Sequence, residues 1–527
     1  MINNRKFTIN YIIISFFIVL ISIISFSLLN SNVNAVNLQL TGSGTASNPY
    51  KIYTCDDFIN FSEYVNSGGI TSNRYFELKN NINLTSSFTP IGTAQYQFRG
   101  HFNGGFNSIS NLNLIGSNYE GSLGLFGYAT NATIEKVIIA SGNISLSENY
   151  YAGAVVGQIS SGCIISNCAN TGLTISSYSN GLAVGGIVGR SLNYSNTVTN
   201  CFNYANLSIR TPSAVAGGIV GLSSGSLTIE ECFNHGTITA NSSNSQNYSV
   251  AGGIIGDGNG ATIRNSYNRG AVTASNTTCN IRDGSITNYN FGMGITQVRE
   301  RRNPRITRGV LAMAGGISGK NGNAYNCYNT ASVRGGYTQT SYSISYSFYY
   351  INITVTGSSG FQQFDTFNTT IYMQCENLAG AITGPYGNWS NCFSNGNVSR
   401  YSLPAETRSG TYIVRNRRKV FSVRVAGVIS VVNYTYNVMY INNSTQNYYE
   451  LLFDCSYDLT PGNDGGATGH PGPLHKPKDI TLKECSNSDI TSSNLGSSFA
   501  SSSFINDGYP YIKSMFWHEY TEDFINN

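Results

Sequence analysis

Short apolar runs recur along the chain, each flanked by glycine and separated from the next by polar residues. The clearest copies read AGAVVG, VGGIVG, AGGIVG, AGGIIG, AGGISG and AGAITG, at residues 152–157, 184–189, 216–221, 251–256, 314–319 and 379–384. A weaker copy, SLGLFG, begins at residue 122, and a degenerate copy, AGVISV, begins at residue 426. Self-similarity of this kind is the signature of a repeat architecture. We therefore expect one structural unit to be copied along the chain.

The second half of each copy is repeated as well. TIEECFNHGTITA at 228–240 matches TVTNCFNYANLSI at 197–209 and ATIRNSYNRGAVTA at 261–274. β-Branched runs on either side of an Asn-rich corner predict about three short strands per copy. Ile229 and Cys232 are three residues apart, so the chain must bend between them if both face inward. A unit this small buries its apolar face only by stacking on neighbours about 4.8 Å away, which predicts an all-β fold, a parallel β-helix or solenoid.

The segments that flank the repeats have the properties of caps. Thr54 and Asp57 have the spacing of a capping box, which predicts a short helix after them. The apolar residues on one face of that helix are Phe58, Phe61 and Val65. Such a helix can cover the open first rung and block edge-to-edge pairing. At the other end, Gly508-Tyr509-Pro510 is expected to end the sheet, because proline donates no backbone hydrogen bond.

The repeats resemble the GLUG motif of exported bacterial proteins, through the string Gly124-Leu125-Phe126-Gly127. The flanking segments also resemble the usual ends of that family, at 44–68, 75–84, 90–93, 98–114 and 495–513. The resemblance covers about residues 42–513. It implies a right-handed β-helix with an adhesin-like role at the cell surface.

The N-terminus has the pattern of an export signal. Arg5 and Lys6 precede an apolar run at about 11–29, and Val33-Asn34-Ala35 is a small-residue cleavage site. We expect a signal peptide at 1–35 and a secreted or cell-surface protein; an uncleaved membrane anchor is the alternative. Removing residues 1–35 takes away two basic residues, which leaves 28 − 26 = +2. This near-neutral balance argues against nucleic-acid binding.

The predicted organisation divides the chain into five parts. These are the signal peptide at 1–35, an N-terminal cap with the first rungs at 36–121, the repeat β-helix at 122–477, a C-terminal cap at 478–517 and a tail at 518–527. Hairpin inserts are expected near 279–313, 335–378 and 400–425. The long intervals between repeat starts at 251, 314 and 379 contain either degenerate rungs or protruding loops.

Two of the inserts have basic turns. Arg301-Arg302-Asn303-Pro304 lies between β-like runs at 295–300 and 305–312, and residues 416–419 lie between runs at 411–415 and 420–425. Hairpins here would place a positive patch on one side of the solenoid, suited to carboxylated or sulfated glycans. Solvated tips that discourage aggregation are the alternative. The candidate ligand-binding residues are Arg299, Arg301, Arg302, Arg305, Arg417, Arg418 and Lys419.

Cysteines and aromatic residues are expected to form ladders along the stack. Five of the 11 cysteines share one repeat position, where Ser266 replaces a sixth: Cys168, Cys201, Cys232, Cys327 and Cys392. We interpret them as small buried side chains, with disulfides or a metal as the alternatives. The 36 Tyr and 26 Phe residues are expected mainly as outward ladders that stabilise stacked strands, with sugar stacking as the alternative.

The sequence contains no recognisable catalytic constellation. Glycoside hydrolysis needs two converging carboxylates, and no clustered Asp pair recurs at a strand position among the 26 acidic residues. His518-Glu519-Tyr520-Thr521-Glu522 has Glu where a zinc protease needs its second His. No C-x-x-C pair occurs. We therefore predict that the chain is not an enzyme and has no catalytic residues, metal or cofactor.

Together these features predict a secreted or cell-surface binding or adhesion protein. Its lateral surface would contact anionic glycans or surface proteins of a host or neighbouring cell, with no nucleic acid and no membrane contact beyond an uncleaved N-terminal segment. A structural surface-layer spacer without a ligand is the first alternative. A carbohydrate-active enzyme is the second, and a groove holding two converging carboxylates would favour it.

Overall fold

The structure is a computed structural model. It describes residues 36–276, 312–336 and 379–398, with gaps at 86–87, 117–120, 147–150, 178–182, 194 and 244–247, and most of 497–515. Elsewhere between 277 and 468 it describes the backbone of individual strands. The signal peptide expected at 1–35, the tail at 518–527, the degenerate string at 426–431 and Arg302 lie outside the described residues.

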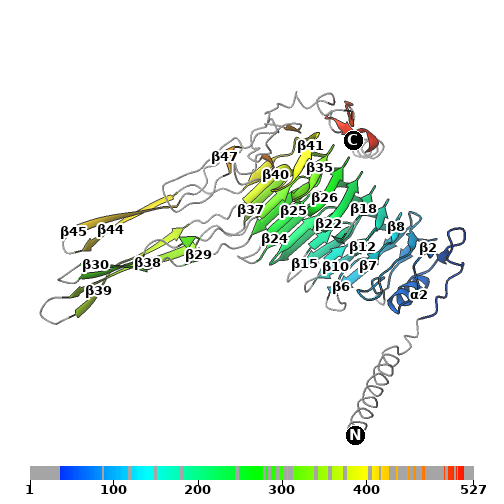
Figure 1. Ribbon diagram of the computed structural model, residues 1–527, viewed down its shortest axis with the longest axis horizontal. Helices are drawn as coiled ribbons and strands as arrows, with labels where there is room; N and C mark the ends of the chain where they lie inside the picture. The colour runs from blue at the N-terminus through cyan, green and yellow to red at the C-terminus, as the bar shows by residue number, and fades with distance from the viewer. Residues whose placement is uncertain are drawn as a thin grey trace, which may run out of the picture.

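A short helix covers the N-terminal end of the molecule (Figure 1). Helix α2 spans Cys55–Asn66, and the predicted capping box is confirmed: Thr54 Oγ1 accepts a hydrogen bond from Asp57 N, and Asp57 Oδ2 accepts one from Thr54 N, both at 3.1 Å. The predicted apolar face, Phe58, Phe61 and Val65, is buried. The Phe61 ring lies 4.4 Å from the ring of Phe76, which belongs to the first rungs. The helix therefore closes the apolar interior at this end.

Behind the helix, strands from successive coils stack into three parallel sheets, as the repeats predict (Figure 1). The wide sheet has 21 strands. They are β1 (Tyr50–Ile52), β2 (Tyr75–Leu78), β4 (His101–Asn103), β7 (Phe126–Thr130), β8 (Thr133–Glu135), β11 (Tyr151–Gly153), β12 (Val156–Ser160), β13 (Ile164–Ser166), β16 (Ala183–Gly185), β17 (Val188–Leu192), β18 (Asn196–Thr199), β21 (Ala214–Gly217), β22 (Val220–Glu230), β25 (Ser249–Gly252), β26 (Ile255–Arg264), β33 (Ala312–Gly315), β34 (Ser318–Lys320), β35 (Asn323–Tyr325), β40 (Asn377–Thr383), β41 (Asn388–Ser390) and β49 (Gly466–Thr468).

The other two parallel sheets contain the second half of each coil. The eight-stranded sheet consists of β6 (Leu112–Ile115), β10 (Gly142–Leu146), β15 (Leu173–Ser177), β20 (Leu207–Thr211), β24 (Ile238–Ser242), β28 (Val272–Asn276), β37 (Val333–Tyr337) and β43 (Val398–Arg400). The ten-stranded sheet consists of β3 (Ile82–Asn83), β5 (Ser108–Ser110), β9 (Ile138–Ile139), β14 (Ala169–Asn170), β19 (Phe202–Asn203), β23 (Phe233–Asn234), β27 (Tyr267–Asn268), β36 (Tyr328–Asn329), β42 (Cys392–Ser394) and β48 (Cys455–Tyr457). The fold is thus an all-β parallel β-helix.

The register shows why the repeat contains glycine at a fixed place. Gly217 pairs with Gly252 of the next coil, and a Cβ atom on Gly217 would lie 1.9 Å from the carbonyl oxygen of Val220. No side chain fits that distance, because strands β21 and β22 of one coil approach each other closely there. The recurring glycine therefore marks a turn that only glycine allows.

The two long intervals between repeat starts contain inserts and no additional rung. Gly252 pairs directly with Gly315, and Gly315 pairs directly with Gly380. Beyond them, Gly380 pairs with Gly466 in β49. The alternatives left open by the sequence are settled by these pairings: residues 277–311 and 338–376 are inserted between neighbouring coils.

The inserts form antiparallel sheets that extend away from one side of the solenoid (Figure 1). Strands β30 (Ile286–Phe291), β31 (Thr296–Arg301), β38 (Tyr342–Ile353) and β39 (Ser359–Ile371) form a four-stranded sheet. Strands β44 (Glu406–Val414) and β45 (Arg417–Val425) pair as a hairpin. Three small pairs complete the strands: β29 (Ile281–Arg282) with β32 (Arg305–Ile306), β46 (Thr435–Tyr436) with β47 (Tyr448–Tyr449), and β50 (Phe499–Ala500) with β51 (Tyr511–Ile512).

The first basic insert differs from the expected hairpin. Strand β31 pairs with β30 and β38, and β32 pairs with β29, so the runs at 295–300 and 305–312 are not partners. The physical reason is that β38, from the following insert, supplies a longer edge for β31 than the two-residue β32 does.

Two columns of side chains, one of asparagines and one of aromatic rings, stabilise the stack. In the interior, Asn203, Asn234 and Asn268 each donate a side-chain hydrogen bond to the next asparagine, the last to Asn329, at 2.7–2.8 Å. These amides are buried, so the ladder supplies the hydrogen bonds that burial requires. The predicted aromatic ladder is also present, with ring centroids 4.3–5.0 Å apart along Phe202, Phe233, Tyr267, Tyr328 and Phe393.

The C-terminal segment packs on the side of this aromatic ladder. The ring centroid of Phe499 lies 6.0 Å from that of Phe393, and Tyr509, Ile512 and Met515 join the same apolar cluster. The 3-10 helix η5 spans Lys513–Met515. The segment thus covers a lateral face of the ten-stranded sheet.

The described cysteines of the ladder are buried free thiols. Each donates to the carbonyl oxygen two residues earlier, as Cys201 does to Thr199 O at 3.2 Å. Burial raises the pKa of Cys168, Cys201 and Cys327 well above the usual value for a thiol. One cysteine that the sequence placed outside the repeat, Cys455, is in register with Cys392.

Candidate functional site

A groove lies on the outer face of the wide sheet, close to the N-terminal end. Its volume is about 380 Å³, which falls in the usual range for small-ligand sites. Strands β2, β4 and β8 form its floor, and the loop that contains Ala46, Ser47 and Pro49 forms one wall. The polar and aromatic side chains of the floor are Tyr75, Glu77, His101, Asn103, Thr133 and Glu135.

The strand register arranges these side chains in two outward columns. Tyr75 pairs with His101 and then Thr133, whereas Glu77 pairs with Asn103 and then Glu135. The residues between the columns are buried, namely Phe76, Phe102 and Ile134. Alternate residues of a strand face opposite sides, so burial of the middle column directs the two flanking columns into the groove.

The aromatic column stacks one ring on another across two rungs. The rings of Tyr75 and His101 are stacked, with centroids 4.3 Å apart and planes 5° from parallel. Both residues are partly exposed, and both line the groove. Stacking on adjacent rungs fixes the orientation of both rings, so the pair is a preformed array of aromatic edges and polar atoms along the groove.

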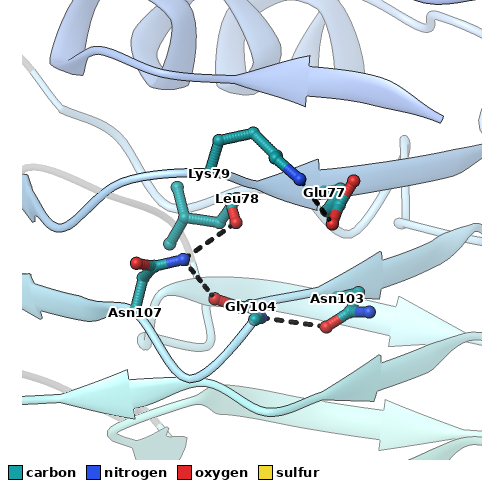
Figure 2. Close-up of polar contacts among 7 residues, drawn as sticks. Glu77, Leu78, Lys79, Asn103, Gly104 and Asn107 are labelled. Atoms are coloured by element: carbon teal, nitrogen blue, oxygen red, sulfur yellow. Dashed lines mark hydrogen bonds and ion pairs between the residues drawn. The ribbon is translucent and has the colours of Figure 1, made fainter.

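The acidic column is balanced by lysines. Glu77 Oε1 lies 3.0 Å from Lys79 Nζ (Figure 2), and Glu135 Oε1 lies 3.7 Å from Lys136 Nζ. The two glutamates remain 26% and 32% exposed, so these ion pairs contribute at most about 1 kcal/mol each. Each carboxylate therefore has a neighbouring cation and remains accessible from the groove.

Hydrogen bonds between asparagine side chains and the backbone hold the middle rung in place. Figure 2 shows the Asn107 side chain, whose Nδ2 donates to Leu78 O at 3.0 Å and to Gly104 O at 3.3 Å. Asn103 Oδ1 accepts a hydrogen bond from Gly105 N at 2.9 Å. These contacts tie β2 to the turn after β4 and fix the amide of Asn103 between the two glutamates.

The structure places the basic residues predicted from the sequence on three insert strands, away from this groove. Arg299 and Arg301 lie on β31, Arg305 on β32, and Arg417, Arg418 and Lys419 on β45. Arg301 is at one end of β31 and Thr296 is at the other. Thr296 pairs with Asn352, near the end of β38 that is farther along the chain from the coil strand β37. The Arg301 end of β31 therefore lies nearer the solenoid. Arg417, in contrast, directly follows the 415–416 connection of its hairpin. The two basic runs therefore do not occupy equivalent tips, and their binding role stays a prediction.

Sequence reasoning did not identify the groove residues. Strands β2 and β4 precede the first glycine-flanked string, β8 follows only the weaker copy at 122–127, and the connections between the three strands differ in length. The available signal is the alternation of polar and apolar residues in YFE at 75–77, HFN at 101–103 and TIE at 133–135. Among the residues that the structure describes, no three His, Cys, Asp or Glu side chains form a group suited to a metal ion. No helix in the described part of the chain is long and apolar enough to cross a membrane.

Comparison with known proteins finds similarity at the level of structure. No family model matches the chain, and no curated protein matches it. One similar solved structure is described as a "putative immunoglobulin A1 protease" from Bacteroides ovatus, with 19% identity, a TM-score of 0.32, and coverage of 43% of this chain and 77% of that chain. A second is named IgA1 protease, with 15% identity, a TM-score of 0.31, and coverage of 62% of this chain and 23% of that chain. The chain thus spans about a quarter of the length of the second protein.

These names contradict the expectation that the chain is not an enzyme, which is therefore withdrawn. At this identity and TM-score the likeness specifies neither a substrate nor catalytic residues for this chain. The β-helical repeat fold of this chain rests on its own strand pairing.

Proposed function

We propose that this chain is an exported, cell-surface or secreted binding protein of the GLUG type that takes up a glycan in the groove on its lateral face. The observation that carries the proposal is the stacked Tyr75–His101 pair, which lies beside a column of polar side chains in the groove. A sugar has complementary chemistry, since its C–H groups can contact the aromatic ring edges and its hydroxyls can bond to amides and carboxylates. Concave sites with a few placed polar groups are typical of small-ligand binding.

The charges of the groove favour a neutral glycan. Lys79 and Lys136 lie beside Glu77 and Glu135, so the column has no large net charge to attract or repel an ionic ligand. Recognition would then depend on stacking and hydrogen bonds. These terms depend little on salt, unlike binding by a charged patch.

Features of the sequence support display outside the cell. Residues 1–35 have the pattern of an export signal, and the repeats resemble those of exported adhesin-like proteins. A glycan on a host or neighbouring cell, or a glycosylated surface protein, is the partner that fits these features.

The proposal is tested by glycan-array binding followed by calorimetry on the strongest neutral oligosaccharide. Replacing Tyr75→Ala removes one ring of the stack and should weaken binding about two- to tenfold, because an aromatic contact contributes about 0.5–1.5 kcal/mol. The matched control is Tyr204→Ala, which removes a 42% exposed tyrosine directly after strand β19 of the ten-stranded sheet. Its affinity should equal that of the wild-type protein.

Two outcomes would contradict the proposal. The first is equal loss of affinity in both tyrosine variants, which would place the ligand outside the groove. The second is a wild-type protein that binds no glycan on the array and self-associates into rods, which would favour the structural spacer.

A further inference from the structure

We propose that the groove also hydrolyses a glycosidic bond of the glycan that it holds, with Glu77 and Glu135 as the acid–base pair. The inference rests on the proposed function, because it needs a glycan in the groove. It assigns a reaction to two carboxylates that binding alone does not require.

The separation of the two glutamates carries the inference. Glu77 pairs with Asn103, and Asn103 pairs with Glu135, so the two carboxylates lie two rungs apart in one outward column. Neighbouring parallel strands are about 4.8 Å apart, which places the two residues about 9.6 Å apart at the backbone. Glycosidases that invert the anomeric carbon hold their carboxyl groups about 6.5–9.5 Å apart, whereas retaining enzymes hold them about 5–5.5 Å apart. This backbone spacing is about the upper limit of the inverting range and far exceeds the retaining distance, so it favours inversion.

The surroundings of the pair suit this reaction. Asn103, on the rung between the glutamates, is fixed by its hydrogen bond from Gly105 N. The stacked Tyr75–His101 pair runs alongside on the neighbouring column, where its ring edges and polar atoms can contact a sugar over the middle rung. The groove of about 380 Å³ leaves room for a sugar unit and a water molecule.

The reaction balances without a cofactor. Glu135, whose contact with its lysine is the longer of the two at 3.7 Å, acts as the acid once it is protonated, and it donates its proton to the glycosidic oxygen as the bond from that oxygen to the anomeric carbon breaks. The other glutamate takes a proton from a water molecule whose oxygen bonds to the anomeric carbon from the opposite face. The products are an alcohol and a sugar of inverted anomeric configuration, and proton exchange with solvent restores the pair.

The full chain is tested with dinitrophenyl and methyl glycosides of common neutral sugars and with the oligosaccharide bound on the array. Substitutions Glu77→Gln and Glu135→Gln should each lower hydrolysis of the oligosaccharide by at least 100-fold, the usual size of a general acid or base effect. The variant that lacks the acid should keep most of its rate on dinitrophenyl glycosides, whose leaving group needs little protonation. The variant that lacks the base should lose both activities. Proton NMR of the first product should show the inverted anomer.

The matched control is Glu230→Gln, which alters a glutamate of the same outward column on a rung beyond the groove. It should keep the wild-type rate. Circular dichroism checks that all three variants retain the β-helix.

The outcomes separate the two proposals. Binding of the oligosaccharide without its hydrolysis overturns the catalytic inference and leaves the binding function standing. Unchanged rates in Glu77→Gln and Glu135→Gln, or a product with retained configuration, also overturn the catalytic inference. Failure to bind any glycan removes both.

Discussion

In coil after coil, one corner residue has a positive φ angle. It lies between a strand of the wide sheet and the following strand of the ten-stranded sheet. Asparagine occupies most of these corners, at Asn167, Asn200, Asn265, Asn326 and Asn391, with φ between 46° and 54°. Asparagine tolerates this left-handed conformation better than other residues with a side chain, because its amide can bond to the local backbone. Two corners depart from the rule, Lys136 and Glu231, with φ of 56° and 52°.

The departure at Glu231 predicts a stabilising substitution. Glu231→Asn should raise the free energy of unfolding by about 0.5–1 kcal/mol, a fraction of the 1–2 kcal/mol that the left-handed region costs an ordinary residue. Thermal unfolding followed by circular dichroism measures the change. The control is Asn265→Glu, which should destabilise the protein because it also removes the hydrogen bond from Asn326 Nδ2 to Asn265 Oδ1 at 3.2 Å. A lower melting temperature for Glu231→Asn would show that the corner is selected for some other property.

At the scale of elements, the coil strands and the insert strands follow different rules. Coil strands pair with the equivalent strand of the next repeat, so a periodic string was enough to predict their partners. Insert strands have no such period, and β31 pairs with β38 from a separate insert. Sequence proximity therefore predicted the wrong partner for β31. The neighbouring pair β44 and β45 is a local hairpin, with Val414 opposite Arg417.

The position of Arg417 beside the hairpin connection leads to a prediction about anionic ligands. Replacing Arg417 and Arg418 by Ser should weaken binding to a sulfated glycan such as heparin by at least tenfold in low salt, with a smaller difference at high ionic strength because exposed charges are screened. Heparin-affinity chromatography and calorimetry measure the effect. The matched comparison is Arg299→Ser with Arg301→Ser, which alters the same charge on β31. Unchanged binding in the first pair would mean that these arginines are only solvated.

At the scale of the whole molecule, the repeat strings predicted the fold because one unit accounts for most of the core. The apolar column, the Cys ladder and the N-terminal helix all follow from local patterns such as the Thr54–Asp57 capping box. The groove did not follow, because it requires the register of three strands with unequal connections. Glu77 and Glu135 are 58 residues apart in the sequence and become members of one column only through Asn103. The arrangement of the groove therefore depends on the register of paired strands, which the sequence alone does not show.

The buried thiols predict how the stability of the stack depends on pH. Burial raises the pKa of Cys168, Cys201 and Cys327 in the folded state, so these thiols stay protonated at a pH where unfolded thiols ionise. The folded state then binds more protons than the unfolded state, and stability is full below the unfolded thiol pKa of about 8.5 and falls as pH rises above it. Each thiol contributes a slope of up to about 1.4 kcal/mol per pH unit.

Urea unfolding between pH 7 and pH 10 measures this slope. Cys168→Ser with Cys201→Ser should flatten it, and serine is a matched replacement because Ser266 occupies the same repeat position. The slope should be unaffected by Cys55→Ser, which alters a partly exposed thiol outside the ladder. Equal slopes in all variants would assign the alkaline loss of stability to groups other than the ladder.

Gly252 pairs directly with Gly315, and Gly315 pairs directly with Gly380. These pairings leave room for the inserts to change during evolution without moving the coils. Both inserts leave the coil after a strand of the eight-stranded sheet, β28 or β37, and return at the next glycine-containing strand. That junction accepts several dozen foreign residues while the neighbouring coils keep their alignment. A lineage can therefore exchange the inserted strands and leave the supporting coils, with the groove near the opposite end, unaltered.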